Sequence, residues 1–269
     1  MNSNNIGVIG LGKLGLTWAL ILASKGYKVI GIEKNKDSVD LLNKGKLTIS
    51  EDGCDKLFKE NIANLSFHNS LNEIQTVPDT IFIVVPSPSL PNERFDSSIV
   101  ENVLFELDNY LCKSDFNYCN VVVTSTLMPG ACESLLAALS EKFKKYVLSN
   151  KVGFCYNPEF IALGSVVRDM LNPDFILIGA KSSLAIEKLS SIYKIVNGVD
   201  ISIKSMSLTS AEITKISINT FLTLKISYAN IVGALCNELS DADKFKVCEA
   251  IGEDTRIGKK YLNPGIGFG

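Results

Sequence analysis

The chain is poor in histidine, and His68 is the only one among its 269 residues. A catalytic triad built on histidine, or a metal site with several histidine ligands, is therefore not expected. The seven cysteines form no Cys-x-x-Cys pair and show no metal-ligand spacing; they are Cys54, Cys112, Cys119, Cys132, Cys155, Cys236 and Cys248. An odd, scattered set of thiols without a signal segment indicates reduced cysteines in the cytoplasm.

The chain also lacks an excess of charge of one sign and a long apolar run near its start. Its 27 lysines and arginines against 29 acidic residues give a net charge of −2, so no nucleic-acid partner is indicated. The first apolar run, Ile6–Ile9, is too short for a signal segment or a membrane span. With 46% hydrophobic and 21% charged residues, the composition is that of a globular protein with one large or two smaller domains.

Short apolar runs rich in Val and Ile alternate with amphipathic stretches over roughly the first 200 residues. The runs predict buried strands at Ile6–Gly10, Lys28–Glu33, Leu65–His68, Thr80–Pro86, Asn120–Ser125, Val152–Tyr156 and Phe175–Gly179. Helices are predicted at Leu14–Lys25, Lys36–Asn43, Ser97–Leu111, Ala131–Tyr146 and Leu184–Val196, with Gly26 and Gly45 at two helix ends. This order indicates an α/β fold with a Rossmann-like, doubly wound and mostly parallel sheet.

The pattern changes near residue 205. Thr209-Ser-Ala-Glu212 has the spacing of a capping box, and apolar residues then follow a helical period to about Leu239. A shorter helix is predicted at Asp243–Ile251. We therefore predict a nucleotide-binding domain in residues 1–203 and an incomplete central helical region in residues 204–269. So long a helix is typical of a second domain or an oligomer interface, here a small dimerisation region.

A glycine-rich loop follows the first predicted strand and opens the first predicted helix, as Gly10-Leu-Gly12-Lys13-Leu14-Gly15. Gly10 allows a tight turn, Gly12 lets a pyrophosphate approach, and Gly15 lets the helix pack on the strand. The helix start would offer N–H donors to the phosphates. Glu33, at the end of the second predicted strand, would accept from both ribose hydroxyls and repel a 2′-phosphate. We therefore expect NAD as the cofactor, although Lys34 adjoins Glu33.

The remaining polar motifs lie where ligands meet an α/β sheet, at the carboxyl ends of its strands. Pro86 and Ser87 follow the fourth predicted strand, Thr126 the fifth, and Glu159 and Phe160 the sixth. Lys215 and Asn219 lie one turn apart on the long helix and therefore share a face. An amine and an amide side by side can handle an alcohol's proton and orient the carbonyl that it becomes. A carboxylate such as Glu159 beside a lysine suits general acid and base chemistry.

Taken together, these motifs resemble the UDP-glucose and GDP-mannose dehydrogenase family, that is, the nucleotide-sugar 6-dehydrogenases. The resemblance runs from residue 5 to residue 269 and includes the following motifs in order, at family spacing: the glycine loop, Asn157-Pro-Glu-Phe160, Asn172-Pro-Asp174, Ser210-Ala-Glu-Ile-Thr-Lys215 with Asn219, Lys225-Ile-Ser227, Arg256-Ile-Gly258 and Leu262-Asn-Pro-Gly265. It implies oxidation of a sugar C6 alcohol to a carboxylate with two NAD, with UDP-glucose as the expected substrate.

The resemblance also implies roles for individual residues. Lys215 would stabilise oxyanion-like charge, Asn219 with Thr126 would orient a water or substrate oxygen, and Glu159 would assist proton transfer and hydrolysis. Further substrate contacts would come from Phe160, Arg256, Leu262, Asn263 and Gly265, with Arg256 reaching across a dimer. A homodimer through the long helix near residues 209–239 is therefore expected, with no metal ion and no membrane partner.

The chain departs from the family pattern at two places. Ala162 and Leu163 stand where the family has arginine and a second glutamate, and Phe175 stands where it often has arginine. The family cysteine that attacks the aldehyde lies beyond Gly269, as does the UDP-binding domain. We therefore expect a truncated form that does not make UDP-glucuronate. Two other interpretations use the same motifs: a β-hydroxyacid dehydrogenase with a single hydride transfer, and a non-catalytic, NAD-binding, dimerising subunit.

Overall fold

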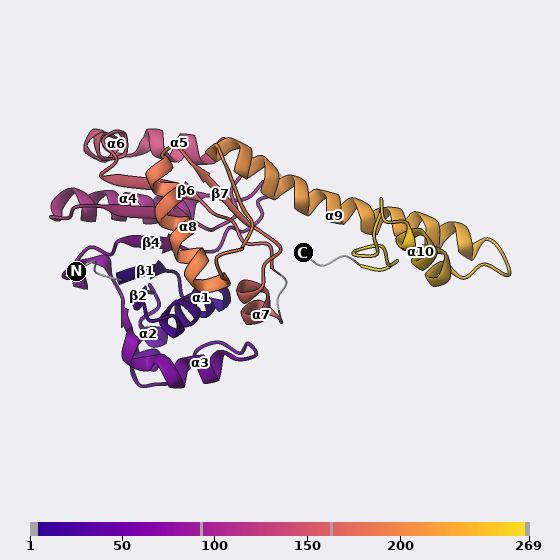
Figure 1. The fold of residues 1–269 in the computed structure, drawn as a ribbon, viewed down its shortest axis with the longest axis horizontal. Helices are drawn as coiled ribbons and strands as arrows, with labels where there is room; N and C mark the ends of the chain where they lie inside the picture. Colours follow the sequence, from indigo (N-terminus) through magenta and orange to yellow (C-terminus); the bar gives the residue numbers. More distant parts are fainter. Residues whose placement is uncertain (1–4, 92–93, 162–163, 267–269) are drawn as a thin grey trace. The chain divides into compact units, whose positions relative to one another are not determined.

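A computed structural model describes residues 5–91, 94–161 and 164–266. The chain divides into two compact units, Met1–Ile213 and Thr214–Gly269. The first unit contains a sheet of eight strands in the order β3-β2-β1-β4-β5-β6-β7-β8 (Figure 1). All neighbouring strands pair in parallel except β6 and β7. The strands are β1 (Asn5–Ile9), β2 (Lys28–Ile32), β3 (Leu65–His68), β4 (Thr80–Ile83), β5 (Cys119–Val123), β6 (Val152–Tyr156), β7 (Ile176–Ala180) and β8 (Ile203–Met206).

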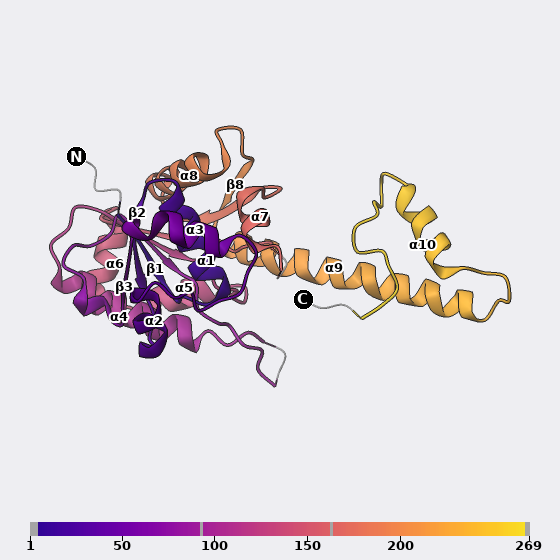
Figure 2. The ribbon, with the colours of Figure 1, turned by 90° about the horizontal axis from the view of Figure 1, so that it is seen from below.

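Helices cover both faces of this sheet (Figure 2). Their apolar side chains form one buried core on each face. One core contains side chains of α1 (Lys13–Ser24), α2 (Lys36–Asn43), α3 (Cys54–Asn61), α7 (Val166–Leu171) and α8 (Ser183–Asn197). The opposite core contains side chains of α4 (Ser98–Lys113), α5 (Ala131–Ala138), α6 (Glu141–Leu148), the 3-10 helix η2 (Leu71–Glu73) and the start of α9 (Leu208–Asn237). A second 3-10 helix, η1, spans Ile62–Asn64. The doubly wound, Rossmann-like α/β fold predicted from the sequence is thus confirmed.

Several elements differ from the prediction. The edge strand β8 was not predicted, and neither were the short helices α3 and α7. Since β8 reaches Met206, the sheet extends past the boundary predicted between residues 203 and 204, and that domain boundary stays a prediction. The long helix is confirmed as α9, a helix of 30 residues. None of the described helices is both long enough and apolar enough to cross a bilayer.

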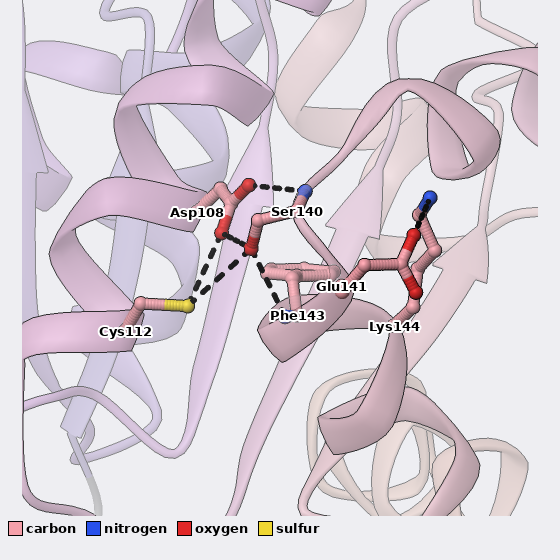
Figure 3. Close-up of polar contacts among 6 residues, drawn as sticks. All are labelled: Asp108, Cys112, Ser140, Glu141, Phe143 and Lys144. Atoms are coloured by element: carbon pink, nitrogen blue, oxygen red, sulfur yellow. Dashed lines mark hydrogen bonds and ion pairs between the residues drawn. The ribbon is translucent and has the colours of Figure 1, made fainter.

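The single helix predicted at Ala131–Tyr146 is wrong, because the chain breaks it into α5 and α6 at Leu139 and Ser140. Ser140 is the N-cap of α6, and its hydroxyl accepts from the N–H of Phe143 at 3.2 Å. The buried Asp108 of α4 accepts from both the N–H and the hydroxyl of Ser140, each at 2.7 Å (Figure 3). Cys112 donates to the same carboxylate at 3.2 Å. This distant carboxylate therefore favours a new helix start over a continuous helix.

The start of α9 also differs from the prediction. Ser207 caps this helix, since its hydroxyl accepts from the N–H of Ser210 at 3.2 Å. The expected capping box at Thr209-Ser-Ala-Glu212 is therefore wrong, and Glu212 bonds to another helix instead. Both its oxygens accept from the start of α5, from the N–H of Gly130 at 2.6 Å and of Cys132 at 2.7 Å.

The second unit combines the rest of α9 with α10 (Lys244–Glu253) and the segment that follows. Asn230 of α9 exchanges two hydrogen bonds with the backbone of Gly265, at 2.7 and 2.9 Å. Lys225 donates to the carbonyls of Ile257 and Gly258, both at 3.1 Å. These contacts hold the segment after α10 against α9.

Candidate functional site

The three glycines of the loop after β1 have different surroundings. A Cβ on Gly10 would lie 2.4 Å from the carbonyl oxygen of Val84, and one on Gly15 would lie 1.9 Å from the carbonyl oxygen of Gly10. A Cβ on Gly12 would meet no atom within 4 Å. Gly10 and Gly15 are thus required by close packing inside the protein. Gly12 faces open space, which leaves room for a ligand to approach the backbone there.

The start of α1 is suited to an anion. Gly12, its N-cap, supplies no side-chain acceptor, and its first turn contains no acidic residue. The N–H groups there carry the partial positive charge of a helix start. Lys13 is exposed and Leu14 is half-buried beside them. This geometry fits the pyrophosphate of a dinucleotide.

Glu33, directly after β2, turns its carboxylate toward the glycine loop. One oxygen accepts from the N–H of Leu11 and the other from the N–H of Asn35, both at 2.9 Å. Glu33 is half-exposed, and each oxygen retains a second lone pair. The carboxylate can therefore hold the loop and still accept from ribose hydroxyls.

The ends of β4 and β5 are joined by Ser125. Its hydroxyl accepts from the N–H of Val85 at 2.9 Å and donates to the carbonyl of Val85 at 2.7 Å. Beside this contact, the hydroxyls of Ser87 and Thr124 are buried without a hydrogen-bond partner in the described part of the chain. Unpartnered buried hydroxyls at the strand ends suit a polar ligand. Pro86 is exposed at the same strand end.

Thr126 is half-exposed in the loop between β5 and α5. The hydroxyl of Tyr156 accepts from the N–H of Leu127 at 3.3 Å, and Glu212 accepts from Gly130 and Cys132 further along. Thr126 thus lies between Ser125, which is bonded to β4, and these two later contacts. The loop is well fixed on both sides of the predicted site residue.

After β6, Asn157 is locked into the core. Its amide donates to the carbonyl of Leu177 at 2.8 Å and accepts from the Tyr193 hydroxyl at 2.5 Å. The Tyr193 hydroxyl also lies 3.4 Å from the Glu159 carboxylate. Burial, and next the Glu159 charge, raise the pKa of Tyr193 well above its usual value, so this phenol stays a donor.

The next residue, Phe160, packs on Phe175 with ring centroids 5.1 Å apart. An aromatic contact therefore occupies the position at which the family often has arginine. Ala162 and Leu163, the other two departures from the family pattern, lie outside the described residues.

The remaining predicted residues lie in the second unit. Lys215 is only 8% exposed, unlike a lysine on a solvated helix face, whereas Asn219 is exposed. That this pair faces the strand ends of the first unit stays a prediction. Arg256 is exposed and bonds to Asp254, with its closest contact at 2.6 Å. Of the other substrate candidates, Leu262 is buried, while Asn263 and Gly265 are exposed.

The cysteines do not resemble nucleophiles. All seven are free thiols, and burial is the largest cause that raises the pKa of six of them: Cys54, Cys112, Cys119, Cys132, Cys155 and Cys248. For Cys155 the pKa rises to about 12. Such thiols remain protonated near neutral pH and react slowly.

Comparison with known proteins identifies the fold and the family. Residues 4–197 match the NAD binding domain of the UDP-glucose/GDP-mannose dehydrogenase family, and residues 209–269 match its central domain. The chain belongs to this family. Its nucleotide domain is therefore an NAD domain, and the glycine loop, the start of α1 and Glu33 fit that cofactor.

The chain is 32% identical, over 98% of its length, to a UDP-glucose 6-dehydrogenase of Rickettsia bellii, of which it covers 59%. A UDP-glucose dehydrogenase structure from Pyrobaculum islandicum matches 98% of the chain with a TM-score of 0.86 and 34% identity, and 60% of that protein is covered. A GDP-mannose dehydrogenase structure from Pseudomonas aeruginosa matches 98% of the chain with a TM-score of 0.83 and 26% identity, again with 60% covered. The chain thus spans about three fifths of these relatives.

The sequence places Ser125 at the end of the fifth strand beside Thr126 but indicates no role for it, and it gives neither Tyr193 nor Glu212 a role in the site. Ser125 adjoins Thr126, so its position at a strand end was a usable signal. Tyr193 and Glu212 lie on α8 and α9, and their partners are 36 and 82 residues away along the chain. No local pattern indicates such contacts.

The surroundings of Gly12 and Gly15 predict opposite effects for alanine substitutions at these two positions. Gly12→Ala should keep the thermal stability of the protein, because its Cβ would enter open space, but should lose most NADH binding by blocking the phosphates. Gly15→Ala should destabilise the fold by about 1–3 kcal/mol or more, because its Cβ would overlap backbone. Thermal unfolding and NADH titration of both variants check this. Unchanged NADH affinity in Gly12→Ala would contradict the assigned phosphate approach.

Proposed function

We propose that this chain contains the NAD-binding and central parts of an enzyme that oxidises the C6 alcohol of a nucleotide sugar, with UDP-glucose as the substrate. The glycine loop carries the proposal. It follows β1, next to β4, where the strand order reverses and where nucleotides bind in such sheets. The open approach at Gly12 lies at this point, and the relatives named above are nucleotide-sugar dehydrogenases.

In this proposal three groups of residues bind three parts of the cofactor. The N–H groups at the start of α1 bind the pyrophosphate, in the cradle formed by Gly10, Gly12 and Gly15 with Lys13 and Leu14. Glu33 binds the adenosine ribose. Pro86, Ser87 and Thr126 line the nicotinamide end, where the unpartnered Ser87 hydroxyl gains a partner. When held by these residues, NAD would supply the acceptor for the hydride of the C6 alcohol.

The remaining residues act on the substrate. Lys215, whose side chain is buried, stabilises negative charge on the C6 oxygen, and charge in a water-poor site acts strongly. Asn219 and Thr126 orient that oxygen or a water. Glu159 moves the proton. Its segment is held in place by the hydrogen bond between Tyr193 and Asn157, and the Tyr193 hydroxyl also lies beside the Glu159 carboxylate. Phe160, Arg256, Leu262, Asn263 and Gly265 bind the nucleotide sugar, and Arg256 reaches the partner's site in a dimer.

The partner proposed for α9 is a second copy of the chain. Five apolar residues on this helix are 49–67% exposed, namely Phe221, Leu224, Tyr228, Ile231 and Leu235. Their spacing alternates between three and four residues, as in the seam of paired helices. A homodimer would bury this apolar stripe (residues 221, 224, 228, 231 and 235) against its own copy.

NADH binding tests the cofactor assignment. Trp18 of α1 is the only tryptophan and lies just after the glycine loop, so energy transfer from Trp18 to NADH can be used to follow binding near this loop. NADH should bind at least about tenfold more tightly than NADPH, a difference of 1.4 kcal/mol or more. Glu33→Gln should weaken NADH binding and narrow that difference, whereas Asp55→Asn on α3 should change neither. Equal affinities for the two cofactors in the wild type would contradict the role of Glu33.

A substrate assay tests the reaction. Incubation with NAD and UDP-glucose tests the sequence-based expectation that this chain does not make UDP-glucuronate, which sustained NADH formation would overturn. Any NADH that forms by hydride transfer should form at least about 100-fold more slowly in Lys215→Met, which keeps the length of the side chain, if the amine stabilises the oxyanion. Circular dichroism would establish that the variant is folded. NADH formation from small 3-hydroxy acids but not from nucleotide sugars would favour the β-hydroxyacid dehydrogenase interpretation. Formation from neither would favour the non-catalytic one.

The dimer is tested by sedimentation velocity. The wild type should sediment as a dimer, and Leu224→Glu combined with Ile231→Glu should sediment as a monomer, because charges would replace the centre of the stripe. Leu148→Glu on α6 is the matched control: Leu148 is 83% exposed outside the stripe, so this variant should remain dimeric. A monomeric wild type would contradict the proposal.

A further inference from the structure

The buried carboxylate of Glu212 binds the backbone at the start of α5. Glu212 is fully buried, and its two oxygens accept from the N–H of Gly130 at 2.6 Å and from the N–H of Cys132 at 2.7 Å. All three residues belong to the first unit. Charge-assisted hydrogen bonds of this length are strong, and a buried carboxylate is costly without them. The contact is therefore a fixed attachment between α9 and α5.

Helix α5 has no cap of its own for these groups. Its N-cap, Gly130, has no side chain and a φ of +86°. Glu212 thus supplies from 80 residues away the negative charge that a helix start favours. Burial, followed by the charge of Glu212, raises the pKa of Cys132 well above its usual value. Glu133, in the first turn of α5, is paired with Lys181 at 2.6 Å, so the carboxylate that accepts from the backbone N–H groups of this helix start is that of Glu212.

The hydrogen bonds of Glu212 are one of three contacts that hold the loop carrying Thr126. On one side of Thr126, the Ser125 hydroxyl bonds to Val85. On the other side, the Leu127 N–H bonds to Tyr156 and the helix start bonds to Glu212. The first two contacts come from strand ends. Only the third comes from α9, on which Lys215 follows Glu212 by three residues.

We propose that Glu212 is a positioning residue. It holds the loop that carries Thr126 in the position in which Thr126 contacts the nicotinamide end of the cofactor. This rests on the proposed function, in which Thr126 contacts that end. Glu212 does not touch the cofactor in this scheme. It acts through Thr126, by fixing the loop end to the first turns of α9.

Glu212→Gln tests the proposal. Glutamine keeps one accepting oxygen, but its NH2 group would face the second backbone N–H, so one of the two hydrogen bonds is lost. NADH affinity, measured by energy transfer from Trp18, should fall about tenfold or more, corresponding to at least 1.4 kcal/mol. Asp108→Asn is the matched control, because Asp108 is also a buried carboxylate that holds a helix start, that of α6. It should lower thermal stability and leave NADH affinity within about twofold, inside the usual range for surface or remote changes.

A double-mutant cycle with Thr126→Ala separates positioning from simple stabilisation. If Glu212 acts through Thr126, the losses of NADH affinity in Glu212→Gln and Thr126→Ala should not add, because residues that act as one unit are coupled. Additive losses, or an NADH affinity of Glu212→Gln equal to that of Asp108→Asn, would overturn the positioning role. Where Glu212→Gln is unfolded, Glu212→Asp decides by the same criteria, since it keeps the charge on a shorter side chain. A wild type that fails to bind NADH would instead overturn the proposed function.

Discussion

The backbone N–H groups at the starts of the helices need acceptors, and in the first unit carboxylates from distant segments supply several of them. Glu212 holds α5, Asp108 holds the N-cap of α6, and Glu51 accepts from the N–H of Val166 at the start of α7 at 3.1 Å. Glu33 does the same for the loop before α1 through the N–H of Leu11. Each contact satisfies donors that the helix itself cannot and adds favourable charge at its positive end. These carboxylates thus attach helix starts and the glycine loop to segments that are distant in the sequence. The start of α1 has neither a side-chain cap nor an acid in its first turn, and so keeps its donors for an anionic ligand.

This arrangement joins residues that are far apart in the chain into one site. The glycine loop is tied to β2 by Glu33, the ends of β4 and β5 are tied by Ser125, and the loop after β5 is tied to α9 by Glu212. A ligand at the strand ends therefore meets a backbone that is already fixed, which reduces the entropy lost on binding.

Local patterns predicted most of the fold, because strands and helices reveal themselves through their periodicity and the glycine loop is a contiguous motif. The seven predicted strands, the long helix and the close packing of Gly10 and Gly15 all followed from neighbours in the sequence. The failures have a common cause. The continuous helix at Ala131–Tyr146 and the capping box at Glu212 were both locally plausible, but Asp108 and Glu212 form their contacts with segments 32 and 80 or more residues away. The role of Tyr193 was hidden for the same reason. Tertiary contacts decided these positions, and a single sequence does not display them.

The long helix α9 carries both the proposed substrate residues and the proposed dimer surface. Along its 30 residues, α9 carries first the attachment at Glu212, then Lys215 and Asn219, and then the apolar stripe from Phe221 to Leu235. Helices of this length draw most of their stability from burial of an apolar face rather than from intrinsic propensity. β-branched residues such as Ile213, Thr214, Ile216 and Ile218 add little helix propensity, so tertiary packing must compensate. Glu212 and its neighbours provide that packing at the first turns, and nothing comparable covers the stripe within the described residues. A second copy of α9 would complete the burial, and the same helix would then connect dimerisation to the placement of Lys215.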